Sequence, residues 1–177
     1  PENATPTVFS MTNPFTPPTL ESIGEGLSVI SVPDERWLHC DIKSISLLGN
    51  ILARQTAVEA GAIEAVLFRD GYLTEGASSN IWVVNDGKLL APPHDNLILE
   101  GIRYELMEEL ARRSGVPFEA RRISQDEVRN ADELLLTAAT KEVKPITRLD
   151  GQPVGKGVPG PIFHKLFAAY QEAKAQR

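Results

Sequence analysis

A lysine in an apolar stretch is the first candidate for chemistry in this sequence. Lys43 lies among Ile42, Ile45, Leu47 and Leu48. A lysine that enters apolar surroundings loses the solvation of its charged form, so its pKa falls and its amine becomes a better nucleophile. The stretch therefore indicates an amine that could form a Schiff base. It fits equally well a solvated lysine whose stem covers apolar surface.

A carboxylate among small residues is the second candidate. Glu75 lies in the segment 74–80, between two predicted strands, and is followed by Gly76, Ser78 and Ser79. A glycine and small polar residues permit close approach of the backbone to a ligand, and the carboxylate could pair with a protonated ring nitrogen. The alternative is a turn with an exposed glutamate.

Two further segments could hold anions. Gly101 opens a predicted helix, whose unpaired N–H groups and dipole favour a phosphate, and Arg103 would add positive charge. The segment 137–141 consists mostly of small residues and follows an apolar strand. Its backbone amides could therefore hold a second anion, either a phosphate or a carboxylate. Together, the amine, the carboxylate and the two anion-holding turns match the aldehyde, ring nitrogen and phosphate of pyridoxal phosphate.

Hydrophobic periodicity predicts the elements that must position these residues. Strands are expected over 7–11, 27–32, 62–68, 81–84, 116–122 and 133–137. Helices are expected over 46–60, from 101 until Gly115, over 125–129 with Ser124 as N-cap, and over 161–173. The Asp86-Gly87 pair predicts a hairpin. The first helix carries one apolar stripe (Leu47, Leu48, Ile51, Leu52 and Val58), and the second turns Ile102, Leu106, Leu110 and Ala111 inward. These elements predict an α+β fold with mostly antiparallel strands.

Composition narrows the classes of function. The chain has 177 residues, enough for one domain, and a net charge of −6 without a Lys/Arg cluster, which argues against a nucleic-acid partner. Its single cysteine, Cys40, excludes an internal disulfide, and no Cys/His spacing indicates a metal site. No apolar run approaches the ~20 residues of a membrane span. We therefore expect a cytoplasmic protein without membrane contact.

The motifs resemble those of the fold type IV pyridoxal-phosphate enzymes, most closely the D-amino acid aminotransferases. The segment Arg36-Trp37-Leu38-His39-Cys40-Asp41-Ile42-Lys43-Ser44 is similar to that family's lysine segment, and Thr74-Glu75-Gly76-Ala77-Ser78-Ser79-Asn80 to its cofactor-ring motif. Asn96-Leu97-Ile98-Leu99-Glu100-Gly101-Ile102-Arg103 resembles its phosphate helix. Thr140-Lys141-Glu142-Val143-Lys144-Pro145-Ile146 resembles its last loop, and 150–155 a following hairpin. The motifs occur in the family's order along nearly the whole chain.

The resemblance implies an architecture and a division into domains. It predicts a mostly antiparallel β pseudo-barrel with flanking helices over 21–177, which would bind the cofactor, preceded by an interdomain linker at the prolines of 13–20. Residues 1–12 would be the last strand of an N-terminal domain absent from this sequence. The start at Pro1 without methionine supports this interpretation. A homodimer is likewise implied.

The resemblance also assigns roles to residues. Lys43 would form the Schiff base and then move the proton at the substrate α-carbon, while Glu75 would hold the ring nitrogen protonated. Ser79 and Asn80 belong to the cofactor motif, and Leu99 would pack against the ring. Amides of Gly101, Ile102 and Arg103, and those around Ala139 and Thr140, would hold the phosphate and the substrate carboxylate. The family usually carries threonine where Arg103 stands and a hydroxyl residue where Ala139 stands.

The expected activity is transamination between a D-amino acid, such as D-alanine, and a 2-oxo acid. A branched-chain L-amino acid aminotransferase and an aminodeoxychorismate lyase share the implied fold and are the alternatives within the family. Ser78-Ser79 favours the D-specific group. A non-catalytic fragment that lacks its N-terminal domain is the alternative of another class.

Overall fold

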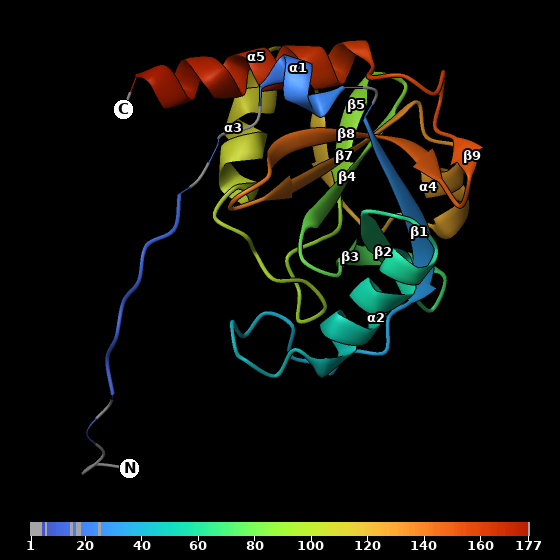
Figure 1. Cartoon of the computed structure of the whole chain (residues 1–177). Helices are drawn as coiled ribbons and strands as arrows, with labels where there is room; N and C mark the ends of the chain where they lie inside the picture. The colour runs from blue at the N-terminus through green and yellow to red at the C-terminus, as the bar shows by residue number, and fades with distance from the viewer. Residues whose placement is uncertain (1–4, 6, 15, 17–18, 25, 177) are drawn as a thin grey trace.

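A computed structural model describes residues 5, 7–14, 16, 19–24 and 26–176, and one curled sheet dominates it (Figure 1). The strands are β1 (Leu27–Pro33), β2 (Glu64–Arg69), β3 (Tyr72–Gly76), β4 (Asn80–Asn85), β5 (Lys88–Ala91), β6 (Phe118–Ala120), β7 (Glu133–Ala138), β8 (Glu142–Leu149) and β9 (Gln152–Pro153). The helices are α1 (Leu20–Ile23), α2 (Leu48–Glu59), α3 (Tyr104–Arg113), α4 (Gln125–Arg129) and α5 (Pro161–Ala175).

The sheet is an open half-barrel with the strand order β3-β2-β1-β8-β7-β4-β5-β6, and β9 pairs with β8. Strand β3 is at one end of this order, and four strands separate it from β4. A tight turn nevertheless joins the two, in which the Gly76 amide donates to the Ser79 carbonyl at 2.7 Å. The sheet must therefore curl until β3 and β4 meet, which brings loops from both halves to one end.

Most strand pairs are antiparallel, as predicted, whereas β1 runs parallel to both β2 and β8, and β5 runs parallel to β6.

Side chains that point alternately to the two faces of β4 show that the sheet has a hydrophobic core on each side. Ile81 and Val83 point into the concave side of the sheet, while Trp82 and Val84 face the other side. Since both faces are covered, β4 reads as a continuous apolar run.

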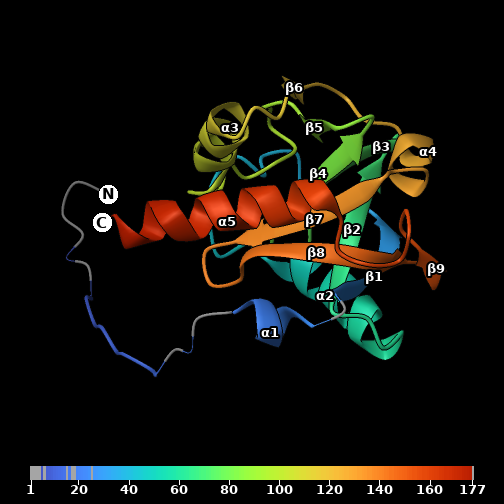
Figure 2. The same ribbon diagram turned by 90° about the horizontal axis from the view of Figure 1, so that it is seen from above.

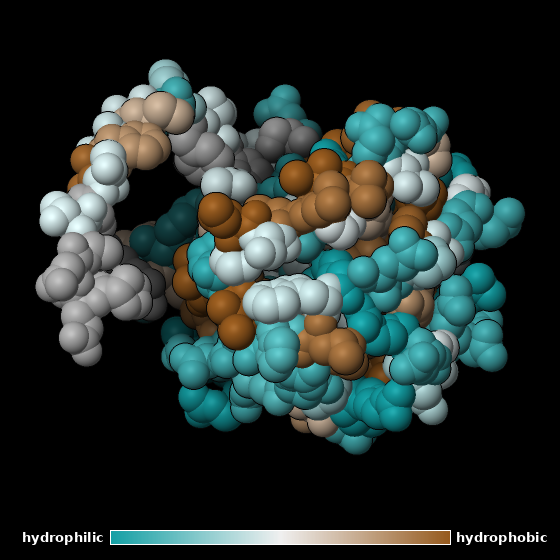
Figure 3. Space-filling model, turned by 90° about the horizontal axis from the view of Figure 1, so that it is seen from below, coloured by the Kyte–Doolittle hydropathy of each residue, from teal (hydrophilic) through white to brown (hydrophobic). Residues whose placement is uncertain are grey.

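Helices α3 and α5 cover the outer face of β4, β5, β7 and β8, and Figure 2 shows α5 lying across β7 and β8. Helix α2 lies on β1 and β2 at the opposite end of the molecule, where only Ala53 and Ala57 are buried. The apolar stripe predicted for this helix points outward, with Leu48 69% and Leu52 57% exposed. Figure 3 views this end of the molecule and shows apolar side chains gathered on it.

Several sequence predictions are confirmed. The first, third and fourth predicted helices correspond to α2, α4 and α5, and Ser124 caps α4 with a full capping box. Asp86 and Gly87 both have positive φ, as the predicted hairpin requires.

Other predictions are wrong. Residues 7–11 form no strand but are exposed and lie outside every helix and strand, because no neighbouring strand offers them hydrogen-bond partners among the described residues. Strand β3 was missed, although Asp70-Gly71 makes the same kind of turn as Asp86-Gly87. The segment compared with a last loop mostly forms β8. Part of the predicted linker over 13–20 lies outside the described residues, and α1 begins at its last residue.

Candidate functional site

A buried network of charged side chains surrounds Arg36. Its Nε and Nη2 donate to the carboxylate of Asp34 at 2.9 and 2.8 Å, and Nη1 donates to Oε1 of Glu75. The side chain of Thr74 donates to Asp34 at 2.8 Å, and Arg69 makes a second ion pair with Asp34 at 3.1 Å. Because Arg36 is only 7% exposed, its planar guanidinium holds two carboxylates in fixed places away from solvent.

Burial and charge act in opposite directions on these groups. Burial raises the pKa of Asp34, but the hydrogen bonds and charge of Arg36 outweigh it and hold this pKa at about 2. Burial raises the pKa of Glu75 to about 7, although the charge and hydrogen bond of Arg36 lower it. Glu75 is thus a carboxyl whose protonation changes near neutral pH and responds to any further positive charge placed beside it.

Glu75 also contacts the segment that leads into α3. The Leu99 amide donates to both carboxylate oxygens, at 3.3 and 3.2 Å. Asn80 donates to Glu75 at 3.4 Å and to the Leu99 carbonyl at 2.9 Å. A Cβ on Gly101 would lie 2.5 Å from the Asn80 side-chain oxygen, so a larger residue there would displace the Asn80 amide from its present contacts. The segments 74–80 and 96–103, which the sequence analysis considered separately, therefore meet in space. We refer to these two segments, together with the residues that contact them, as the cluster.

The N-terminal end of α3 presents free backbone donors. The helix begins at Tyr104, later than predicted, and residues 102 and 103 form a turn before it. No side chain caps it, and within the described part of the chain no acceptor faces the amides of Gly101, Ile102 and Arg103. Ile102, predicted to point inward, is 81% exposed because it precedes the helix. This end of α3 could hold an anion.

The turn between β7 and β8 (residues 139–141, here the β7–β8 turn) lies beside this helix end. Arg103 Nε donates to the Ala138 carbonyl at 2.7 Å, and Nη2 donates to the Ala139 carbonyl at 2.6 Å. On the other side of the turn, the Lys141 ammonium lies 3.0 Å from the carboxylate of Glu64, which is completely buried. The side chains of Ser78 and Ser79 donate to the same carboxylate. Contacts thus join the β7–β8 turn to the helix end and to the β3–β4 turn.

Lys43 is the predicted site residue that the structure does not bring to this cluster. It is exposed, and so are Ile42, Ile45, Leu47 and Leu48, so the apolar environment predicted for its amine is absent. Its loop is nonetheless fixed at Cys40, whose amide donates to the Asn96 carbonyl at 2.9 Å.

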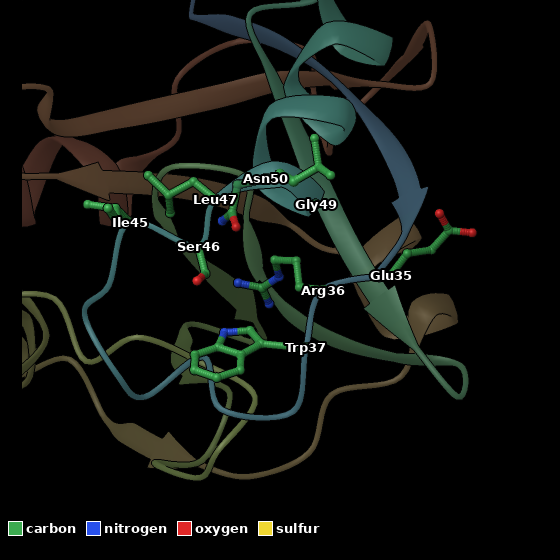
Figure 4. Close-up of a pocket in the computed structure, with 9 residues that line it drawn as sticks. Glu35, Arg36, Trp37, Ile45, Ser46, Leu47, Gly49 and Asn50 are labelled. Atoms are coloured by element: carbon green, nitrogen blue, oxygen red, sulfur yellow. The ribbon is translucent and has the colours of Figure 1, made fainter.

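A cavity of about 420 Å³ adjoins this loop and is lined by residues 35–37 and 45–50. Figure 4 shows the Arg36 guanidinium pointing into it, between Trp37 and Ser46. Asn50 on its wall donates to the Ala77 carbonyl at 2.9 Å, which links α2 to the β3–β4 turn. None of the predicted site residues lines this cavity, so it does not unite them.

Charged residues that the sequence did not predict as site residues include Asp34, Arg36, Glu64 and Lys141. Arg36 and Lys141 lie within motif segments but carry no local signal of an ion pair. Asp34 follows the predicted strand 27–32, and Glu64 lies within the predicted strand 62–68. Asp34 and Arg36 are two residues apart, but Arg36 and Glu75, and likewise Glu64 and Lys141, are distant in sequence, and only the curling of the sheet brings them together.

None of the described helices is long and apolar enough to cross a membrane. Within the described ranges, no group of three or more His, Cys, Asp or Glu side chains could hold a metal ion.

Comparison with known sequences gives consistent matches. Residues 1–149 match the family described as "Amino-transferase class IV". The chain is 42% identical over 169 residues to a D-alanine aminotransferase of Bacillus licheniformis, covering 96% of this chain and 59% of that protein. It is 37% identical over 167 residues to the D-alanine aminotransferase of Staphylococcus aureus (strain MSSA476), with 94% and 59% covered. The chain thus spans less than two thirds of the length of these relatives.

Two solved branched-chain aminotransferases have the same fold as this chain. One from the archaeon Thermoproteus uzoniensis, with norvaline, superposes with a TM-score of 0.78 at 30% identity, over 84% of this chain and 51% of that one. A mutant form of the enzyme from Thermobaculum terrenum superposes with a TM-score of 0.77 at 30% identity, over 88% of this chain and 53% of that one. The half-barrel seen here is therefore that of the fold type IV aminotransferases.

Proposed function

Because the chain belongs to the class IV aminotransferases, we propose that it binds pyridoxal phosphate and takes part in transamination between a D-amino acid, such as D-alanine, and a 2-oxo acid. The choice of D-amino acids is supported by the 42% identity to a D-alanine aminotransferase. One structural observation supports pyridoxal phosphate as the cofactor. A buried carboxylate, Glu75, is hydrogen-bonded to the segment that ends in free helix amides.

The donor set of the cluster fits this cofactor. Glu75 would keep the ring nitrogen protonated, and its pKa of about 7 would fall beside that positive charge. Leu99, next to it, would pack against the ring, while Ser79 and Asn80 would support the same side. When bound, the cofactor supplies an electron sink for negative charge that develops at the substrate α-carbon.

The backbone amides complete the proposed site. Those of Gly101, Ile102 and Arg103 would bind the phosphate together with amides of the β7–β8 turn. Ala139 and Thr140 would also face the incoming carboxylate. Backbone donors suffice here in principle, because amide N–H groups at a helix end bind anions without a hydroxyl side chain.

Lys43 is proposed to hold the aldehyde of the cofactor and to move the proton at the α-carbon. In the structure its amine is exposed, and among the described residues Glu75 is hydrogen-bonded to Arg36, Asn80 and Leu99 but not to this amine. The role therefore requires that the loop 37–47, anchored at Cys40, bring the amine to the ring when the cofactor binds. Lys141, half-buried beside Ser78, is the competing amine of the cluster.

Reductive labelling tests the proposal. The 177-residue chain would be mixed with pyridoxal phosphate, reduced with borohydride and mapped by peptide mass spectrometry, with Lys43→Ala and Lys141→Met as matched variants. We expect one label on Lys43, retained in Lys141→Met and lost in Lys43→Ala. A label on Lys141, or labels spread over surface lysines in the unaltered chain, would contradict the assignment.

A branched-chain L-amino acid aminotransferase is the second candidate, because the structural neighbours described above carry that name. Adding D-alanine, L-alanine or L-leucine to the unreduced, loaded protein separates the two activities. Loss of the cofactor's visible band with D-alanine alone supports the first proposal. A response to L-leucine but not to D-alanine supports the second.

The assembly and location remain part of the proposal. We propose a homodimer, supported by the apolar face that α2 leaves exposed. A cytoplasmic location is proposed on the sequence features given above.

A further inference from the structure

Arg103 links three elements at the proposed phosphate site. Its Nε and Nη2 donate to the carbonyls of Ala138 and Ala139, and its Nη1 donates to the Tyr170 hydroxyl on α5. The guanidinium carbon also lies 4.9 Å from the centre of the Tyr170 ring. One side chain from the end of α3 thus reaches both the β7–β8 turn and α5.

These contacts determine where the amides of the turn point. The structure has no cis peptide bond among its described residues, and in a planar trans peptide the C=O and the following N–H point in opposite directions. Since the carbonyls of Ala138 and Ala139 face Arg103, the N–H groups of Ala139 and Thr140 face away from it. Neither amide meets an acceptor in the described part of the chain. They are two free donors on the side of the turn away from Arg103.

The Arg103 guanidinium, which contacts the β7–β8 turn, keeps its positive charge. Burial lowers the pKa of Arg103, and the charge of Glu142 opposes this effect, but a guanidinium stays protonated in either case. Glu142 itself is paired with Lys174 at 2.9 Å, and Gln171 donates to it at 2.9 Å. A hydrogen bond from a charged donor also polarises the accepting peptide, so its own N–H becomes a better donor to an anion.

We propose that Arg103 is a positioning residue for the cofactor's phosphate. It does not bind the phosphate through its side chain, but it orients the Ala139 and Thr140 amides and fixes them relative to the end of α3. The inference rests on the proposed function, because that function supplies the phosphate. It also accounts for an arginine where the resembled family usually carries threonine.

Comparison of two aldehydes isolates the phosphate contact. Dissociation constants of pyridoxal phosphate and of pyridoxal would be measured by absorbance titration of the unaltered chain, Arg103→Met, Arg103→Lys and Arg112→Met. Arg112 is an exposed arginine near the other end of α3 and serves as the control. We expect Arg103→Met to weaken pyridoxal phosphate binding about 10- to 100-fold, as for the loss of hydrogen bonds to a charged group. Pyridoxal binding should not change.

Arg103→Lys separates positioning from simple charge. Lysine keeps the charge but cannot span two carbonyls, so we expect it to bind pyridoxal phosphate almost as weakly as Arg103→Met. Full rescue by lysine would overturn the inference. Tyr170→Phe, which keeps both carbonyl contacts, provides a milder variant if Arg103→Met fails to fold, and we expect it to weaken phosphate binding by a smaller factor. No effect of either variant would overturn the inference as well.

An NMR titration with inorganic phosphate gives a readout without the ring. We expect phosphate to shift the amide resonances of Ala139 and Thr140 in the unaltered chain but not in Arg103→Met. Equal shifts in the unaltered chain and in Arg103→Met would overturn the positioning role of Arg103 but not the proposed function. If the unaltered chain does not prefer pyridoxal phosphate to pyridoxal, the proposed function itself fails, so the two failures are distinguishable.

Discussion

At the scale of single residues, the unusual feature is a buried arginine shared by two carboxylates. The Arg36 guanidinium donates two hydrogen bonds to Asp34 and one to Glu75, and the backbone carbonyl of Leu97 accepts another at 3.0 Å. Removing one partner of such a network leaves an uncompensated buried charge, which costs more than the intact pair contributes. The network therefore holds Glu75 in place through contacts within the protein itself.

Glu75 should make stability depend on pH near neutrality. Its folded-state pKa of about 7 lies above its ordinary value of 4.5. Between these values the folded protein binds more protons than the unfolded chain, so the free energy of unfolding falls as pH rises from about 5 to 7. Asp34, with a pKa of about 2, loses its contribution only below that window.

The matching experiment compares urea unfolding of the unaltered chain, Glu75→Gln and Glu172→Gln at about pH 5, 6, 7 and 8. We expect Glu75→Gln to remove a decline of roughly 1–3 kcal/mol, on the scale of about 1.4 kcal/mol for each pKa unit. Glu172 is exposed and should leave the decline unchanged. An identical decline in Glu75→Gln would show that another group causes it.

At the scale of elements, helix α5 depends on a side chain from the sheet for its first turn. The first turn of α5 has Gly160 as its N-cap, which offers no side chain. Instead, the buried carboxylate of Glu133 on β7 accepts hydrogen bonds from the amides of Ile162 and Phe163, both at 2.8 Å. This carboxylate both caps the helix and attaches it to the sheet, with a charge that suits the positive end of the helix dipole.

Glu133→Gln should accordingly destabilise the fold by about 1–2 kcal/mol, because an amide caps less well and carries no charge. The free energy of unfolding from urea titration measures this loss of stability, and Glu172→Gln, at an exposed site on α5, serves as the control. A loss no larger than that of the control would mean that packing alone holds α5.

At the scale of the whole molecule, one end is conspicuously apolar. The outward residues of α2 and the preceding loop include Ile45, Leu48, Ile51 and Leu52, exposed by 97, 69, 60 and 57%. Contiguous apolar surface of this kind usually belongs to an interface. We therefore assign this end of the molecule to the proposed homodimer.

Sedimentation velocity tests the assignment with the double variant Leu48→Glu/Leu52→Glu. We expect a dimer for the unaltered chain and a monomer with unchanged circular dichroism for the variant, because two carboxylates cannot be buried unpaired in an apolar interface. Lys165→Glu, at an exposed site on α5, serves as the charge control and should stay dimeric. A variant that remains dimeric would place the interface elsewhere.

Local signals in the sequence determined much of the secondary structure. The capping box at Ser124, the proline that opens α5 and the Asp-Gly turns act over a few residues, so their outcome does not depend on the rest of the fold. The motifs also identified Glu75, Gly101 and the β7–β8 turn as a possible cofactor site, because each kind of ligand group requires a particular kind of residue.

Only the tertiary structure decided which residues meet and which faces are covered. The ion pair between Glu64 and Lys141 and the contact of Arg103 with Ala139 join residues far apart in sequence, and they exist because the sheet curls until its loops converge. Periodicity marked an apolar stripe on α2, but periodicity cannot say which side faces the sheet, and here the alanines do. The same limit applies to Lys43: its apolar neighbours predicted burial, yet burial depends on what packs against them.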